Sequence, residues 1–114
     1  MSKEFDIYIE SGMRRMEQIR DYKEIAKRVK DLAEEIIGRV DVYVFGSVIE
    51  GRTVASSDID ILIIADNINK EDAYKLKAKI YKLIDAPIEL HIASTKEFEG
   101  WYKRFIKRMK RIEP

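Results

Sequence analysis

The strongest constraint on the fold is an almost unbroken apolar run over residues 59–65, which only Asp60 interrupts. A short run of this kind is typical of a β-strand that is covered on both faces. Residues 40–45, and residues 88–93 after Pro87, form two further short apolar stretches. We therefore expect a small sheet in which the 59–65 strand is the most deeply buried.

Helical periodicity precedes the first of these strands. Apolar residues repeat at spacings of three and four over residues 22–37, and Gly38 follows as a stop signal. Asp21 and Glu24 have the spacing of a capping box. Residues 3–20 fit either a helical stripe or, at their start, an alternating strand, and the helix is the favoured interpretation.

Two more capping signals predict two more helices. Asn69 can cap a helix that lies between the second and third strands. Ser94 and Glu97 form a second capping box, which starts a last helix that runs to about residue 112 with a buried aromatic stripe. The stripe consists of Phe98, Trp101, Tyr102, Phe105, Met109 and Ile112.

The order of these elements predicts the fold class. Helices and strands alternate without a Pro/Gly/Ser-rich linker, and 114 residues suit one domain. We expect an α+β domain over residues 1–114, with a small mixed sheet flanked by helices. Its core covers about residues 22–112, and residues 1–20 form a helical extension.

Composition narrows the class of protein. The chain has no Cys, which excludes disulfides and thiolate metal sites, and it has no long apolar run, so we expect a cytoplasmic protein without a membrane span. Charged residues make up 38% of the chain, a composition seen in thermophile proteins. Basic residues crowd the last predicted helix, where they form either a solvated face or a surface that attracts phosphate or RNA. They are Lys103, Arg104, Lys107, Arg108, Lys110 and Arg111.

The first strand ends in Gly46-Ser47. If a helical turn begins there, its free N–H groups and the Ser47 hydroxyl form a cradle for an anion, and Gly46 lets a phosphate approach the backbone. A Gly-Ser pair after a strand is also a common simple turn.

Carboxylates accompany the other two strands. Asp58 and Asp60 lie two residues apart at the start of the second strand, so both should point to one face. Two neighbouring carboxylates repel unless a cation lies between them, and divalent cations prefer oxygen ligands. Glu89 and His91 share one face of the third strand. Taken alone, each has a simpler interpretation: an acidic turn for the Asp pair, an edge charge for Glu89, a strand histidine without function for His91.

Strand pairing would bring these groups together. Only ten residues separate Ser47 from Asp58, which favours an antiparallel pair over a crossover. Gly46-Ser47 and the two Asp residues then meet at one edge of the sheet, and Glu89 joins them if the third strand lies beside the second. A phosphate cradle beside a metal-binding carboxylate cluster is the machinery of phosphoryl or nucleotidyl transfer.

The sequence resembles a known family at these residues. Gly46-Ser47, ten residues, and Asp58-Ile59-Asp60 resemble the signature of the DNA polymerase β-like nucleotidyltransferases, and Phe45 and Ser57 match its small prokaryotic members. The chain is similar to the minimal nucleotidyltransferases, the antitoxin half of pairs whose toxin is a helical HEPN ribonuclease. The resemblance covers roughly residues 20–112 and implies the palm fold of that superfamily.

The resemblance also implies roles for the site residues. Gly46 and Ser47 would hold the β- and γ-phosphates of ATP or another nucleoside triphosphate. Asp58 and Asp60 would hold two Mg²⁺ ions, or Mn²⁺. Glu89 would bind the metal on the acceptor side and help to deprotonate the attacking hydroxyl.

One position departs from the family pattern. Many relatives carry a basic residue immediately before the Gly that follows the turn, whereas here Glu50 precedes Gly51 and Arg52 follows it. Arg52 is therefore the candidate for the missing nucleotide-binding cation.

The expected activity is transfer of AMP from ATP to a hydroxyl, in this family a Tyr of the partner HEPN toxin. One alternative is a catalytically weak antitoxin that acts by direct binding. Another is a small-molecule nucleotidyltransferase of the aminoglycoside-modifying kind, for which 114 residues leave little room. Self-association stays open.

Overall fold

A four-stranded mixed sheet forms the centre of the domain. The computed structural model describes residues 3–114, with the side chains of residues 4, 5 and 105–107 outside the description. The strands are β1 (Asp41–Phe45), β2 (Ile59–Ile64), β3 (Ile88–Ala93) and β4 (Lys110–Arg111). Their order is β3-β2-β1-β4, with β1 antiparallel to both β2 and β4, and β2 parallel to β3. The expected antiparallel first pair and the place of the third strand beside the second are confirmed.

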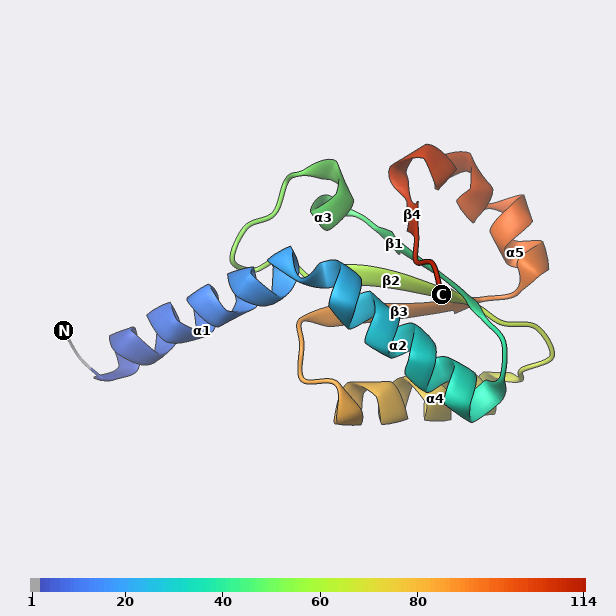
Figure 1. Cartoon of the computed structure of the whole chain (residues 1–114), viewed down its shortest axis with the longest axis horizontal. Helices are drawn as coiled ribbons and strands as arrows, with labels where there is room; N and C mark the ends of the chain where they lie inside the picture. The colour runs from blue at the N-terminus through green and yellow to red at the C-terminus, as the bar shows by residue number, and fades with distance from the viewer. Residues whose placement is uncertain (1–2) are drawn as a thin grey trace.

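Helices lie on both faces of the sheet, which confirms the α+β class (Figure 1). In Figure 1, α2 and α4 lie below the sheet, and α5 with the 3₁₀ segment η1 lies above it. The helical segments are α1 (Lys3–Arg20), α2 (Tyr22–Ile37), α3 (Ser47–Glu50), α4 (Lys70–Leu83), α5 (Thr95–Gly100) and η1 (Tyr102–Arg108).

Strand alternation divides the core between the two faces. Every second residue of β1 and β2 points toward α2 and α4, and Val42, Val44 and Ile61 are fully buried there. On the other face a smaller cluster centres on Leu62 and Ile64, which pack under side chains of α5 and η1. That cluster covers the later part of β2, so the start of the strand, where Asp60 lies, keeps a polar environment.

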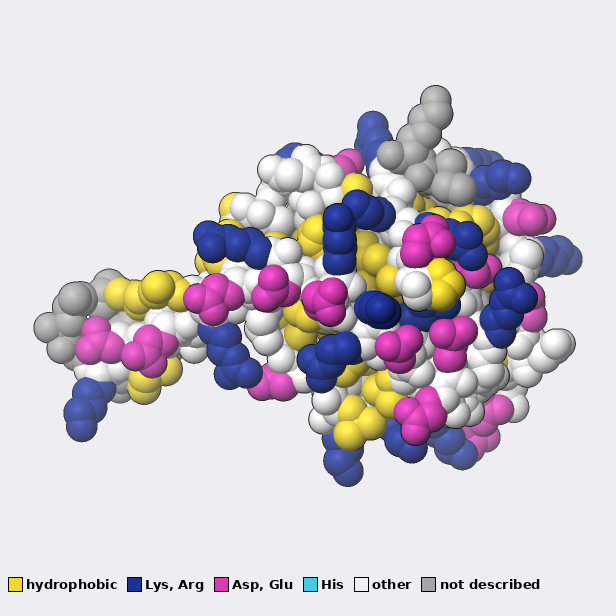
Figure 2. Space-filling view, in the orientation of Figure 1, with side chains coloured by type: hydrophobic (Ala, Val, Ile, Leu, Met, Phe, Trp, Pro, Cys, Tyr) yellow, Lys and Arg dark blue, Asp and Glu magenta, His cyan; other side chains and the backbone are white. Residues whose placement is uncertain are grey.

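The first helix projects from the domain (Figures 1 and 2). The favoured helical interpretation of residues 3–20 is confirmed, but the capping box at Asp21 is wrong. The backbone N–H of Asp21 donates to the carbonyl of Glu17, and the N–H of Ile25 donates to the carbonyl of Asp21, both at 3.1 Å. The two helices are therefore almost continuous, and the Asp21 side chain makes no cap hydrogen bond.

The last predicted helix is only partly correct. Its capping box at Ser94 and Glu97 is confirmed, but the α-helix ends at Gly100. The chain then returns to the sheet edge, where the N–H of Ile112 donates to the carbonyl of Val42 at 2.8 Å. Pairing with the free edge of β1 and burial of Ile112 outweigh continuation of the helix. Trp101, predicted to be buried, is 57% exposed, and the side chain of Phe105 lies outside the described part.

Within residues 3–114, every helix is too short or too polar to serve as a membrane span.

Part of the basic C-terminal surface is neutralised within the chain. A guanidinium nitrogen of Arg111 lies 3.1 Å from Asp41, and one of Arg108 lies 3.5 Å from Glu50. On the face shown in Figure 2, basic and acidic side chains are interspersed. This mixture of charges does not support an RNA-attracting patch, which stays a prediction.

Candidate active site

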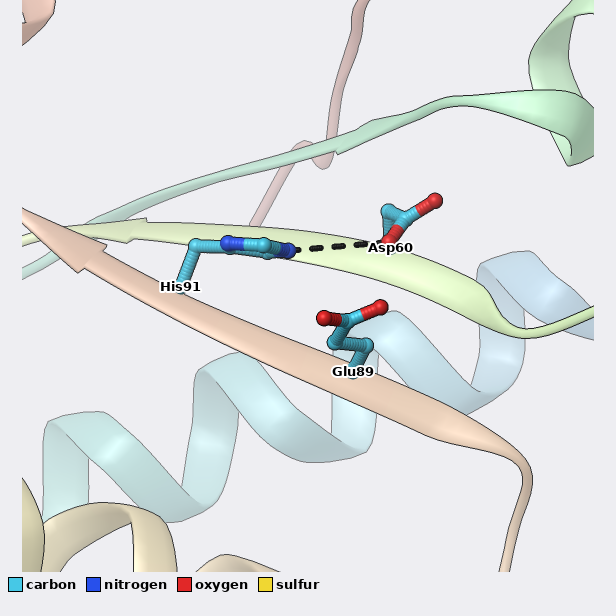
Figure 3. Close-up of side chains that lie close together, drawn as sticks. All are labelled: Asp60, Glu89 and His91. Atoms are coloured by element: carbon cyan, nitrogen blue, oxygen red, sulfur yellow. Dashed lines mark ion pairs between the residues drawn. The ribbon is translucent and has the colours of Figure 1, made fainter.

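Asp60 and Glu89 are direct neighbours in the sheet. They are paired in the register of the parallel strands β2 and β3, so both side chains project from the same face. His91, two residues after Glu89, projects there as well (Figure 3). One ligand atom from each of the three side chains lies within 4.8 Å of the other two.

Burial and charge make this cluster receptive to a cation. Burial raises the pKa of Asp60, and the charge of Glu89 raises it further, while His91 acts in the opposite direction. The His91 Nε2 atom lies 3.5 Å from Oδ1 of Asp60. That nitrogen is buried and has no hydrogen-bond partner among the described residues. Two carboxylates and a buried imidazole nitrogen form a donor set suited to a divalent metal.

The Gly46 turn lies against the same carboxylate. Phe45, the last residue of β1, is paired in register with Asp60, and the chain turns immediately afterwards. Gly46 has φ 81° and ψ −155°, a region that is essentially restricted to glycine. A Cβ built on Gly46 would overlap Oδ2 of Asp60 and lie 3.2 Å from its Cγ. The structure therefore brings the predicted phosphate turn, Gly46 and Ser47, beside Asp60.

Asp58 lies outside the converging cluster. Strand β2 begins at Ile59, so Asp58 precedes the strand rather than sharing its alternation with Asp60. Its carboxylate accepts a hydrogen bond from the guanidinium of Arg15, which comes from α1. Arg15 also donates from Nε to the carbonyl of Ser57 at 3.0 Å. Among the described residues, the group with ligand atoms within 4.8 Å of one another contains His91 with Asp60 and Glu89, and it does not contain Asp58. The role of Asp58 as a metal ligand stays a prediction.

Arg52 forms an ion pair with Glu50. Its guanidinium lies 2.5 Å from a carboxylate oxygen of Glu50, and the hydrogen bond from Arg52 lowers the pKa of Glu50. Arg108 approaches the same carboxylate from the C-terminal segment. Glu50 therefore forms ion pairs with two arginine side chains at the end of the short α3 helix.

Sequence reasoning undervalued one residue and missed another. The alternation of β3 placed His91 on the same face as Glu89. That position was the sequence signal that His91 could join the cluster. The contact between Arg15 and Asp58 spans 43 positions. No local pattern signals a contact of this kind, because it depends on where α1 lies in three dimensions.

Comparison with known proteins identifies the family. The model of the nucleotidyltransferase domain matches residues 22–113. The chain belongs to this family. The match contains β1, β2, β3 and the whole cluster described above.

Solved structures of nucleotidyltransferases show the same fold. One named as a nucleotidyltransferase is 32% identical, with a TM-score of 0.62 over 76% of this chain and 96% of that chain. A toxin–antitoxin with AMP-PNP is 22% identical, with a TM-score of 0.57 over 77% of this chain and 72% of the other. An antitoxin from Shewanella oneidensis, in complex with a tri-AMPylated HEPN toxin, is 20% identical, with a TM-score of 0.51 over 78% and 69%. The chain has no match among curated proteins.

Proposed function

We propose that this nucleotidyltransferase domain transfers a nucleoside monophosphate, AMP from ATP, to a hydroxyl group in a metal-dependent reaction. The observation that carries the proposal is the position of Asp60, with Glu89 on one side and the Gly46 turn on the other. Nucleotidyl transfer needs metal-binding carboxylates beside a phosphate-binding turn, because the divalent cations must contact both the carboxylates and the phosphates that the turn holds.

The two carboxylates of the donor set fit Mg²⁺ or Mn²⁺. Asp60 and Glu89 supply oxygen atoms, and His91 adds a buried nitrogen that has no hydrogen-bond partner in the described part of the chain. Asp58 would complete the set for a second ion once its carboxylate leaves Arg15. Bound divalent cations neutralise phosphate charge and stabilise the displacement.

The remaining roles fall to residues at the turn and on β3. The backbone N–H groups and hydroxyl of Gly46-Ser47 would donate to the β- and γ-phosphates. The guanidinium of Arg52 would add a positive charge beside the phosphates if its ion pair with Glu50 opened. Glu89 would accept the proton of the acceptor hydroxyl. The acceptor oxygen then bonds to the α-phosphorus, and pyrophosphate leaves with the electrons of the broken P–O bond.

For the acceptor we propose a tyrosine of a HEPN-type toxin. Support comes from the similar fold of an antitoxin that was solved with an AMPylated HEPN toxin. A second candidate is an antitoxin that acts by contact alone. Two observations favour that alternative: the Asp58 carboxylate is paired with Arg15, and Arg52, the candidate nucleotide-binding cation, is paired with Glu50.

Nucleotide binding provides the first test. Isothermal titration calorimetry with ATP, with and without Mg²⁺, should show binding that strengthens with the metal and is largely lost in Asp60→Asn. Asp31→Asn, which changes an exposed carboxylate on α2, is the matched control and should bind like wild type. Equal ATP binding with and without Mg²⁺ would contradict the proposal.

A further inference from the structure

A small apolar pocket adjoins the phosphate turn. It has a volume of about 230 Å³ and lies between the turn and the C-terminal segment. Its apolar walls are Phe45, Trp101, Tyr102 and Met109, and the backbone of Gly46 forms part of its lining. The pocket is lined by residues at α3 and by residues of the segment that follows α5, and these two segments face each other in Figure 1. Pockets for whole drug-sized ligands measure about 300–1,000 Å³, so this one suits a single planar group.

The pocket and the candidate active site share two residues. Gly46 lines the pocket and also lies against the carboxylate of Asp60. The ring of Phe45 lines the pocket, and its centroid lies 5.1 Å from that of His91. A triphosphate held at Gly46-Ser47 would therefore have the rest of the nucleotide directly beside this pocket.

The lining has the chemistry of a base-binding site. Three aromatic rings and a thioether can contact the flat faces of a purine or pyrimidine, and stacking of this kind tolerates any base. The rings of Trp101 and Tyr102 lie edge to face with centroids 5.0 Å apart. Trp101 is more than half exposed at the mouth of the pocket, although a side chain of this size is normally well buried.

We propose that this pocket binds the nucleobase of the nucleoside triphosphate, with Trp101 as the stacking surface. The proposal rests on the function proposed above and adds the place where the base binds. The edge of the pocket is charged, since Glu50 and Arg108 line it and their side chains lie 3.5 Å apart. That charged edge disfavours a purely apolar occupant and fits a base, which has polar edges and apolar faces.

Trp101 is the only tryptophan of the chain, so intrinsic fluorescence reports on this pocket directly. Titration with ATP and Mg²⁺ should change the emission of Trp101. Tripolyphosphate with Mg²⁺, which has no base, should bind in calorimetry yet leave the emission nearly unchanged. The same emission change with both ligands, or ATP binding without any change, would overturn the proposal.

Substitution gives an independent test. Trp101→Ala should weaken ATP binding roughly tenfold while leaving tripolyphosphate binding unchanged, and Trp101→Phe should retain most of the affinity. The matched control is Tyr74→Ala, which removes an exposed aromatic ring from α4 on the opposite face of the sheet. Thermal melts check that all three variants fold.

The outcomes separate this proposal from the function on which it rests. If ATP binds with Mg²⁺ and needs Asp60, but Trp101→Ala binds ATP like wild type, the base lies elsewhere and only the pocket assignment fails. If Trp101→Ala weakens ATP and tripolyphosphate equally, Trp101 supports the fold and not the base. If neither ligand binds to wild type, both proposals fail.

Discussion

The backbone of Gly46 lies directly against the carboxylate of Asp60, so that a Cβ at position 46 would overlap Oδ2. This contact couples the turn to the candidate metal-binding cluster, and it explains why a side chain is excluded at that position. It also makes the two residues energetically dependent on each other.

Gly46→Ala should therefore destabilise the domain in two ways. The backbone conformation of Gly46 costs a non-glycine residue about 1–3 kcal/mol, and the clash with Asp60 adds to this cost. In an Asp60→Ala background only the backbone cost should remain. Urea denaturation of both single variants and the double variant measures the coupling. An equal loss of unfolding free energy in both backgrounds would show that the Asp60 contact is irrelevant.

Asp60→Asn should leave the metal-free domain as stable as wild type or more stable. Burial and Glu89 raise the pKa of Asp60, so the folded state binds its proton more tightly than the unfolded chain does. The ionised carboxylate consequently lowers stability at neutral pH. A gain of about 1 kcal/mol would raise the melting temperature by about 4–8 °C.

The pH dependence of this gain has a definite sign. The advantage of Asp60→Asn should be present above the raised pKa of Asp60 and should vanish as the pH falls below the ordinary aspartate pKa. Calorimetric melts at neutral and acidic pH measure it. A large loss of stability at neutral pH would instead identify Asp60 as part of a structural ion pair.

Arg15→Ala should strengthen binding of Mg²⁺ and ATP, because it releases the Asp58 carboxylate. Both partners are partly exposed, and such pairs contribute about 0.2–1 kcal/mol, so the gain should be at most about fivefold. Arg14→Ala is the matched control. Arg14 lies on the same helix as Arg15 and forms an ion pair with Asp85 at 2.7 Å. Weaker ATP binding in Arg15→Ala would mean that Arg15 contacts the nucleotide itself.

His91→Gln should change which metals the site prefers. An imidazole nitrogen ligand favours Co²⁺ and Ni²⁺ over Mg²⁺, and an oxygen ligand shows less of this preference. The substitution should therefore weaken Co²⁺ binding by about tenfold or more, and Mg²⁺ binding much less. Because His91 is the only histidine, the Co²⁺ absorption spectrum of wild type reports on a single imidazole. Identical Co²⁺ affinity in the two proteins would exclude His91 as a ligand.

The sequence was sufficient for β1, β2 and β3, because each of these strands carries its own signal. The apolar run of β2 and the ten-residue connection before it predicted the antiparallel pair with β1. From that pairing followed the approach of Gly46 to Asp60. Alternation along β3 placed Glu89 on the face of the sheet from which Asp60 also projects.

The structure differs from the sequence-based expectations where long-range contacts decide the local structure. Residues 101–112 contain a helical stripe, but the free edge of β1 takes residues 110 and 111 into a fourth strand. Asp58 was expected beside Asp60 because both were assigned to one strand. Strand β2 begins one residue later, and α1 supplies Arg15 as a partner for Asp58. Neither contact can be predicted from the pattern of neighbouring residues, because each joins residues that are far apart in the sequence.

The most direct test of the account is transfer of AMP itself. The chain is incubated with α-³²P-labelled ATP, Mg²⁺ and a HEPN-type toxin, the partner proposed above, and label on that toxin is followed by gel and mass spectrometry. Wild type and Asp31→Asn should add the mass of AMP to a tyrosine of the partner. Asp60→Asn should abolish transfer. Ser47→Ala should retain some activity, because it removes one hydrogen bond to a charged phosphate, worth about 1.5–3 kcal/mol. If wild type transfers nothing yet silences the partner, and Asp60→Asn silences it equally well, the protein is an antitoxin that acts by contact and the catalytic account is wrong.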